Sequence, residues 1–294
     1  MNRFNSAASL LPPALCSELL VQPKSVKDAA EEIRLRRGQA MSLLAGGREI
    51  SVKESYKISL FDLEAVLERA TEASVYAVEQ ELSAGFISVE GGIRLGVCGT
   101  AVVNCGSVSS IRDLSSVSVR IPHEVRDCGG EVLQSILSAG LDSTLILSPP
   151  GGGKTTCMRE YIRTISEQGY RVSVADERFE LAGVYEGEPQ FDIGPRTDVI
   201  SGAKKSEAAM MLLRAMNPQV LAMDEISSDE DISAAETASG CGVKLLATAH
   251  ADSVQSLYKR PIYKKLMELK EFKYAVTIRN TDGKRDYLLE ELRL

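Results

Sequence analysis

The stretch LILSPPGGGKTT, from Leu145 to Thr156, decides the fold. Its apolar first half predicts a strand that ends at Ser148, and its second half predicts a helix that begins at Lys154. The glycines let the backbone curl without Cβ clashes, so several backbone N–H groups gather at the helix N-terminus and form an anion site. Lys154 supplies an ammonium group for the β- and γ-phosphates, and the Thr155 hydroxyl is placed to ligate Mg²⁺. The loop therefore predicts a site for ATP and Mg²⁺. Its expected nucleotide-binding residues are Pro150, Gly151, Gly152, Gly153, Lys154, Thr155 and Thr156.

The first position of this loop departs from the general phosphate-loop pattern. The pattern G-x-x-x-x-G-K-[ST] asks for glycine at position 148, where this chain has Ser148. The close-approach glycines, the lysine and the threonine remain. A glycine-rich turn with a chance lysine is the alternative, and the strand and helix on either side disfavour it.

An acidic pair ends a second apolar strand in QVLAMDEI, residues 219–226. Asp224 is expected to hold Mg²⁺ through water, and Glu225 is expected to polarise the attacking water as a general base. An Asp-Glu pair after a buried strand can also simply begin a loop. The phosphate loop upstream favours the catalytic interpretation.

A third buried strand, KLLATAH at residues 244–250, ends in Thr248 and His250. Either side chain, at the tip of a strand beside the acidic one, can sense the γ-phosphate or orient the water. A plain surface or core histidine is the alternative for His250.

Three ionisable residues end a further strand in SVADERFELAG, residues 173–183. Asp176, Glu177 and Arg178 lie where doubly wound sheets place ligands, so they are expected to face the nucleotide or a neighbouring subunit. A solvated charged loop is the alternative.

Four other arginines are candidates for contacts with phosphate. Arg196 and Arg214 are placed for phosphate or interface contacts, whereas Arg94 and Arg120 could reach the nucleotide of an adjacent protomer as arginine fingers. For each of them alone, an ordinary surface ion pair is the competing interpretation.

The order of the expected strands and helices predicts two domains. Residues 1–130 mix short strands and helices, and residues 131–294 alternate strand and helix as in a parallel sheet with covered faces. In the first part we expect a meander over 31–51, a helical region over 60–85, a hairpin that turns at Gly91 and Gly92, and a strand over 115–121. In the second part we expect strands at 143–148, 171–176, 219–224 and 243–249, helices at 154–168, 203–216, 229–239 and 253–270, and a C-terminal hairpin around Thr281, Asp282 and Gly283.

The composition excludes several classes of protein. A net charge of −7 over 294 residues gives no global attraction to nucleic acid. The basic and aromatic stretch 258–274 is expected to be a packed amphipathic helix rather than a nucleic-acid strip. Six cysteines without a C-x-x-C pair, together with two histidines, indicate neither a zinc site nor a disulfide framework. No apolar stretch is long enough to cross a bilayer, and the N-terminus is poor signal-peptide material, so we expect a cytoplasmic protein.

The order of these motifs resembles the stage III sporulation protein AA family. The resemblance rests on SPPGGGKTT, ADERFELAG, LLATAH and the block GPRTDVISGAKKSEAAMMLLRAMNPQVLAMDEI, together with ELSAGFISVEGGIRLGVCGTAVV in the first domain. It covers about residues 75–275, and Ser148 is expected in that family.

The resemblance implies a RecA-like P-loop ATPase core, related to the secretion and type IV pilus ATPases, with a smaller N-terminal α+β domain. It implies a homo-hexamer on the mother-cell side of the forespore membrane, peripheral to membrane-embedded components of a secretion-like channel. Carried over by position, Lys154, Thr155, Asp224 and Glu225 are the nucleotide and catalytic residues, and Glu177 belongs to an acidic box.

Two other classes of function are compatible with a RecA-like core, because fold alone does not settle function. The first is a nucleic-acid motor such as a helicase loader or translocase, which the acidic composition disfavours. The second is a non-catalytic nucleotide switch, which Glu225 disfavours.

Overall fold

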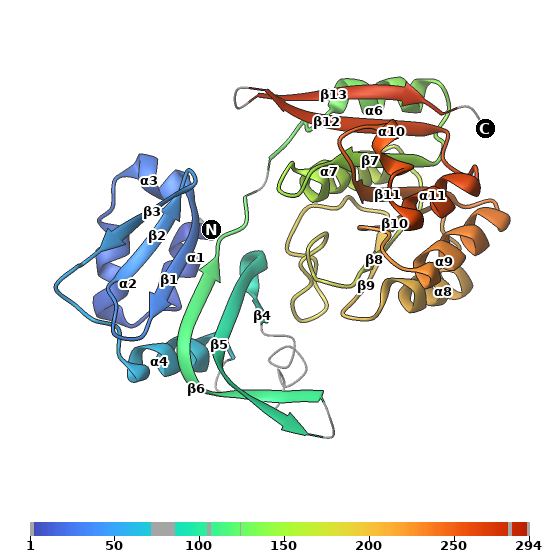
Figure 1. Ribbon diagram of the computed structural model, residues 1–294. Helices are drawn as coiled ribbons and strands as arrows, with labels where there is room; N and C mark the ends of the chain where they lie inside the picture. The colour runs from blue at the N-terminus through green and yellow to red at the C-terminus, as the bar shows by residue number, and fades with distance from the viewer. Residues whose placement is uncertain (1–2, 72–85, 105–106, 124, 282–283, 293–294) are drawn as a thin grey trace. The chain divides into compact units, whose positions relative to one another are not determined.

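The computed structural model describes residues 3–71, 86–104, 107–123, 125–281 and 284–292. The chain forms two compact units (Figure 1). The first unit comprises Met1–His123 and Gly183–Gln190, and the second comprises Glu124–Ala182 and Phe191–Leu294. The segment Gly183–Gln190 therefore leaves the second unit and returns to it.

The first unit is built on a six-stranded sheet in the order β3-β2-β1-β6-β5-β4, in which every neighbouring pair is antiparallel. The predicted meander and the hairpin at Gly91 and Gly92 are confirmed, and the strand expected at 115–121 is longer than predicted. The strands are β1 (Ala30–Arg36), β2 (Met41–Ala45), β3 (Arg48–Val52), β4 (Phe86–Val89), β5 (Ile93–Asn104) and β6 (Ser107–Arg120).

Helices α1 (Arg3–Ser9), α2 (Pro13–Leu20), α3 (Lys24–Asp28) and α4 (Leu60–Ala70) complete this unit. Helix α4 begins with a reciprocal cap, in which Ser59 Oγ accepts from the backbone N–H of Asp62, and the Asp62 carboxylate accepts from that of Ser59. Leu63 and Val66 on its inner face are buried in the core of the unit. Residues 72–85 of the expected helical region lie outside the described residues.

The second unit is built on a seven-stranded sheet in the order β13-β12-β7-β11-β10-β8-β9. Strands β12 to β9 in that order run parallel, and β13 is antiparallel to β12. The strands are β7 (Thr144–Ser148), β8 (Val172–Asp176), β9 (Thr197–Ser201), β10 (Val220–Met223), β11 (Lys244–His250), β12 (Tyr274–Thr281) and β13 (Lys284–Glu291).

Helices cover both faces of this sheet. Alternate residues of the central strands face opposite sides, so Leu245 joins a core cluster with α8 (Lys205–Ala215), α9 (Asp229–Gly240) and α11 (Pro261–Glu268). Leu246 lies on the other side, with residues of α6 (Gly130–Ser138) and α7 (Lys154–Glu167). The four predicted strands of the sheet and the C-terminal hairpin are confirmed.

Two features of this unit differ from the sequence prediction. The single helix expected over 253–270 is wrong, because the chain forms α10 (Val254–Leu257) and then α11, which starts at Pro261. Proline has no N–H for a continuing helix, and it is suited to a first helical turn. The edge strand β9 was not predicted. Helix α11 does have an apolar side, on which Tyr263 and Leu266 are buried.

The parallel strands bring the predicted motifs to one edge of the sheet. Ser148 at the end of β7 pairs with His250 at the end of β11, and Asp224 directly follows β10, which neighbours β11. Asp176 ends β8 on the other side of β10. All four segments therefore finish at the carboxyl ends of adjacent parallel strands, where ligands of such sheets bind.

Candidate functional site

The loop between β7 and α7 has room only for glycine at its centre. A Cβ on Gly152 would overlap Ser148 Oγ and would lie 3.1 Å from the carbonyl oxygen of Pro149. Gly151 and Gly153 have φ angles of 74° and 97°, in the left-handed region. The Ser148 hydroxyl donates to Pro149 O at 3.0 Å, so a small side chain at this position helps to close the loop.

Lys154 reaches back over this loop. Its Nζ donates to Ser148 O at 3.0 Å and to Pro149 O at 3.1 Å, and the residue is only 6% exposed. Burial lowers the pKa of Lys154, although the nearby carboxylates of Asp224 and Glu225 act in the opposite direction. A desolvated ammonium group at a curled, glycine-rich loop fits a phosphate chain, whose negative charge would stabilise the charged form.

His250 connects Lys154 to the candidate general base. Its Nδ1 lies 2.8 Å from Lys154 Nζ, and its Nε2 lies 3.1 Å from Glu225 Oε1. An ammonium group can only donate, so Nδ1 accepts, and the neutral tautomer with its proton on Nε2 can donate to Glu225. The sequence left open whether Thr248 or His250 is the polar residue at the site, and the structure places both of them there.

Thr248 and Thr155 orient the carboxylate of Asp224. Thr248 Oγ1 donates to Asp224 Oδ1 at 2.7 Å, and Thr155 Oγ1 lies 3.4 Å from Asp224 Oδ2. The backbone N–H of Glu225 donates to both Thr248 Oγ1 and Asp224 Oδ1. A hydroxyl and a carboxylate oxygen held together beside the phosphate loop are the hard oxygen donors that Mg²⁺ prefers.

Lys205 holds the backbone of Glu225 and was not singled out from the sequence. Glu225 has a φ of 31°, which is unusual for a residue with a side chain, and its carbonyl accepts from Lys205 Nζ at 2.8 Å. Lys205 is only 7% exposed, and its ammonium group lies 3.5 Å from Glu177 Oε2 and 3.8 Å from Asp231 Oδ2. One buried lysine thus contacts the carboxylate of Glu177 and the backbone carbonyl of Glu225, the two glutamates predicted to be catalytic.

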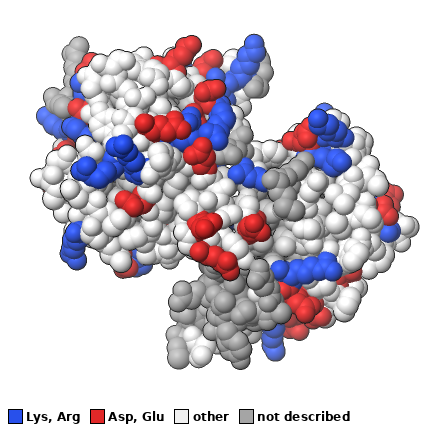
Figure 2. Space-filling model, turned by 180° about the vertical axis from the view of Figure 1, so that it is seen from behind, with Lys and Arg blue, Asp and Glu red and all other residues white. Residues whose placement is uncertain are grey.

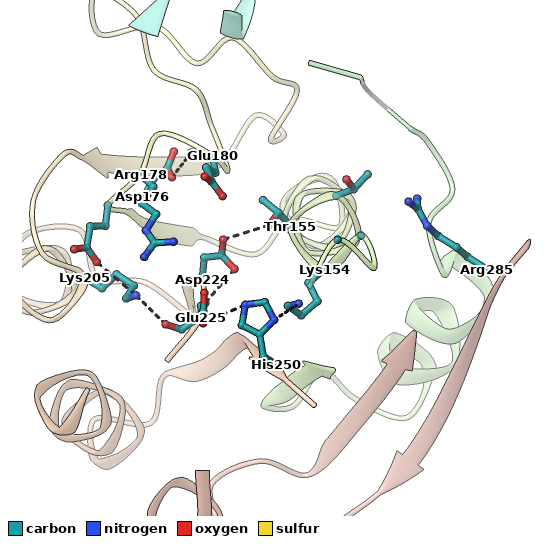
Figure 3. Close-up of a pocket in the computed structure, with 14 residues that line it drawn as sticks. Lys154, Thr155, Asp176, Arg178, Glu180, Lys205, Asp224, Glu225, His250 and Arg285 are labelled. Carbon is teal, nitrogen blue, oxygen red and sulfur yellow. Dashed lines mark hydrogen bonds and ion pairs between the residues drawn. The ribbon is translucent and has the colours of Figure 1, made fainter. Parts of the chain in front are cut away.

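These side chains open onto a pocket of about 390 Å³ (Figure 3). Most of the predicted site residues line it, namely Gly151, Gly153, Lys154, Thr155, Thr156, Glu177, Asp224, Glu225 and His250. Pro150 and Gly152 belong to the loop but are not part of this lining. Asp176, Arg178, Glu180, Lys205 and Arg285 also line the pocket, and of these Asp176 and Arg178 were named from the sequence.

Asp176 differs from its neighbour Glu177. Its carboxylate is buried and accepts three backbone N–H groups, from Glu180 at 2.8 Å, Leu181 at 3.1 Å and Ala182 at 2.9 Å. These bonds hold the loop after β8 in place. Asp176, Glu177 and Glu180 all line the pocket, but Glu177 has a more exposed side chain, and its carboxylate contacts Lys205.

Two of the four candidate arginines, Arg196 and Arg214, belong to the second unit and are not among the residues that line its pocket. Arg196 donates to the carbonyl of Gly169 at 2.7 Å, and Arg214 is an exposed residue of α8. Arg94 and Arg120 are paired across β5 and β6 in the first unit. Their role as arginine fingers toward an adjacent protomer stays a prediction.

Comparison with known proteins identifies the family. The family described as "Sporulation stage III, protein AA" matches residues 6–287. Stage III sporulation protein AA of Bacillus subtilis is 32% identical over 286 residues, which cover 95% of this chain and 92% of that protein. The chain belongs to the stage III sporulation protein AA family. The resemblance drawn from the sequence motifs is therefore confirmed.

Solved structures show which fold this family member shares. The pilus retraction motor PilT with bound ADP matches with a TM-score of 0.62 at 17% identity, over 92% of this chain and 80% of that chain. The Legionella pneumophila ATPase DotB matches with a TM-score of 0.56 at 16% identity, over 90% of this chain and 76% of that chain. The fold is that of the RecA-like P-loop ATPases, as predicted. Over the described residues, none of the helices has both the length and the apolar character that a membrane crossing requires.

Proposed function

We propose that this protein is a Mg²⁺-dependent ATPase that energises a secretion-like channel, or its assembly, between mother cell and forespore. The observation that carries the proposal is the chain of contacts from Lys154 through His250 to Glu225, beside the Thr155 and Asp224 pair. Membership of a sporulation family and the fold shared with the ATPase DotB and the pilus retraction motor PilT support it.

Each residue of the pocket has a role in this proposal. The loop N–H groups and Lys154 bind the phosphates, and Thr155 and Asp224 hold Mg²⁺. A bound Mg²⁺ would neutralise charge on the phosphate oxygens. Glu225 accepts a proton from the attacking water, and Lys205 and Thr248 fix the Glu225 backbone from opposite sides.

His250 transmits the presence of phosphate to Glu225. In the structure Lys154 is held by the carbonyls of Ser148 and Pro149 and by His250 Nδ1. When Lys154 turns to a phosphate chain, His250 loses one of its two partners and keeps the other, Glu225. Glu177 contacts the ammonium group of Lys205, which donates to the backbone carbonyl of Glu225 and so helps to position that residue.

The working assembly is proposed to be a homo-hexamer at the cytoplasmic face of the forespore membrane, docked on membrane-embedded channel components. Sizing the protein by light scattering with and without ATP tests the assembly. A particle that stays monomeric in both conditions would contradict a ring.

A nucleic-acid motor has less support. The net charge is −7, and on the face that Figure 2 shows, Lys and Arg side chains are interspersed with Asp and Glu. Strong stimulation of ATP hydrolysis by single- or double-stranded DNA would favour that alternative.

The Glu225→Gln variant tests the catalytic assignment. Removal of a general base lowers turnover by about 10²- to 10⁴-fold, so we expect the variant to bind ATP but to hydrolyse it at least about 100-fold more slowly. Lys154→Ala should lose nucleotide binding altogether. Glu230→Gln, an exposed position of α9 outside the pocket, is the matched control. Equal phosphate release by the unmodified protein and Glu225→Gln would remove Glu225 from the catalytic role and favour a nucleotide switch.

A further inference from the structure

The C-terminal hairpin extends beyond the edge of the sheet beside the phosphate loop. Strand β12 runs parallel to β7 and pairs with it up to Thr277 and Leu147, one residue before β7 ends. Strand β12 then continues to Thr281, and Arg285 of β13 pairs with Asn280 in this overhang. The hairpin therefore carries Arg285 past the end of β7, to the level of the loop that follows it.

The guanidinium group of Arg285 lies against this loop. A Cβ on Gly153 would be 3.0 Å from Arg285 Cζ and 3.2 Å from its Nη1, so the group is next to the Gly153 backbone. Arg285 also lines the pocket that contains Lys154 and Glu225. It approaches the N-terminus of α7 from the side opposite Asp224 (Figure 3).

The positive charge of Arg285 is available to a ligand. The ammonium groups of Lys154 and Lys205, which line the same pocket, are engaged by carbonyl oxygens, His250 or carboxylates. Arg285 makes no hydrogen bond or ion pair with any residue that the structure describes, and it is exposed. A guanidinium group is always charged at physiological pH and presents a planar fork that matches two phosphate oxygens.

The position of Arg285 also determines which part of a nucleotide it can reach. Lys154, Asp224, Glu225 and His250 gather on one side of the loop, where the proposed mechanism places the γ-phosphate. Arg285 is next to Gly153 and lies on the opposite side of Lys154 from Asp224 and Glu225 (Figure 3), so a phosphate chain that runs along the loop presents its nucleoside end there.

We propose that Arg285 binds the nucleotide held by the phosphate loop of its own chain, and that its guanidinium group contacts the α-phosphate, the one attached to the nucleoside. The proposal rests on the proposed ATPase function and adds to it. Because ATP and ADP share this phosphate, Arg285 strengthens the binding of both by the same factor. The C-terminal hairpin is then part of the nucleotide site.

Calorimetric titration of the full chain with ADP, with a non-hydrolysable ATP analogue and with inorganic tripolyphosphate tests the proposal. Hydrogen bonds to charged groups are strong enough that Arg285→Ala should weaken all three about tenfold. Arg285→Lys, which keeps the charge but not the fork, should recover part of the loss. Arg279→Ala is the matched control, because Arg279 is an exposed cation of the same hairpin outside the ATP pocket.

Three results would overturn the proposal, and the third would also contradict the proposed ATPase function. ADP affinity within twofold of the unmodified protein in Arg285→Ala would overturn this inference alone. Weaker ADP binding with unchanged tripolyphosphate binding would show that Arg285 contacts the nucleoside and not a phosphate. A failure of the unmodified protein to bind any of the three ligands would remove the proposed function as well. Thermal unfolding of each variant shows whether the exposed substitution leaves the fold intact.

Discussion

Substitution of Gly152 by alanine tests the phosphate loop with the smallest possible change. The added methyl group would overlap Ser148 Oγ, and it would lie 3.0 Å from Ser148 Cβ and 3.1 Å from Pro149 O. Rotation of the Ser148 hydroxyl relieves only the first contact and gives up its bond to Pro149 O. The other two contacts involve the loop's own backbone and a Cβ, so the loop has to open by a few tenths of an ångström.

The magnitude follows from the bonds that the loop makes. A hydrogen bond between a backbone N–H and a charged phosphate contributes about 1.5–3 kcal/mol. If the opening removes two of them, the loss is about 3–6 kcal/mol, which corresponds to about 10²- to 10⁴-fold in Kd. The fold itself loses the bond from Ser148 to Pro149, so the free energy of unfolding falls by only about 1 kcal/mol.

Calorimetric titration with ADP and chemical denaturation measure these two quantities separately. The matched control is Gly240→Ala at the end of α9, where an added Cβ meets no heavy atom within 4 Å. We expect the control to leave ADP affinity unchanged. An ADP Kd of Gly152→Ala within a few-fold of the unmodified value would refute the inference that the loop binds phosphate in this conformation.

Two further predictions concern the lysines of the pocket. Lys205→Met should lower kcat about tenfold with little change in the Kd for ADP, because Lys205 donates to the Glu225 carbonyl. Lys205→Arg should recover part of the loss. A lower affinity with normal kcat would contradict this positioning role. The affinity for ADP should fall as pH rises through the alkaline range below 10.5, because burial lowers the pKa of free Lys154 and a bound phosphate raises it. At pH values below the pKa of Lys154 in the free protein, the ammonium group is charged both with and without ADP, so the affinity for ADP is at its maximum. Titrations from neutral pH to about pH 10 measure this fall, and a flat profile would contradict it.

The sequence alone was sufficient for the parts of the fold that rest on local patterns. The apolar run before Ser148, the glycines and the residues after Lys154 describe a strand, a loop and a helix within one short stretch, and the structure has β7 and α7 at these places. Asp224 and His250 could be brought to the same edge because parallel strands end together. The sequences of these motifs and their order along the chain also identified the family.

Residues that act through contacts between distant segments could not be found in this way. Lys205 reaches the carbonyl of Glu225 across 20 positions, and Arg285 reaches Gly153 only because β12 pairs with β7. Strand β9 has no buried side to produce an alternating pattern, since all its residues are half-buried. The break before Pro261 was visible in the sequence, because proline cannot continue a helix, but the apolar spacing around it favoured one long helix.

Asp176 and Asp224 show that residue type and strand position alone do not determine the role of a carboxylate. Both are aspartates at the end of a buried parallel strand, although the sequence analysis assigned Mg²⁺ to Asp224 and expected Asp176 to face the nucleotide or a neighbouring subunit. After Asp176 the chain turns back, and the N–H groups of Glu180, Leu181 and Ala182 all point at its carboxylate. Asp224 Oδ1 accepts from the N–H of Glu225 and from Thr248, and Asp224 Oδ2 lies 3.4 Å from Thr155 Oγ1. The backbone of the residues that follow each strand therefore decides which carboxylate stabilises a loop and which is available to a cation.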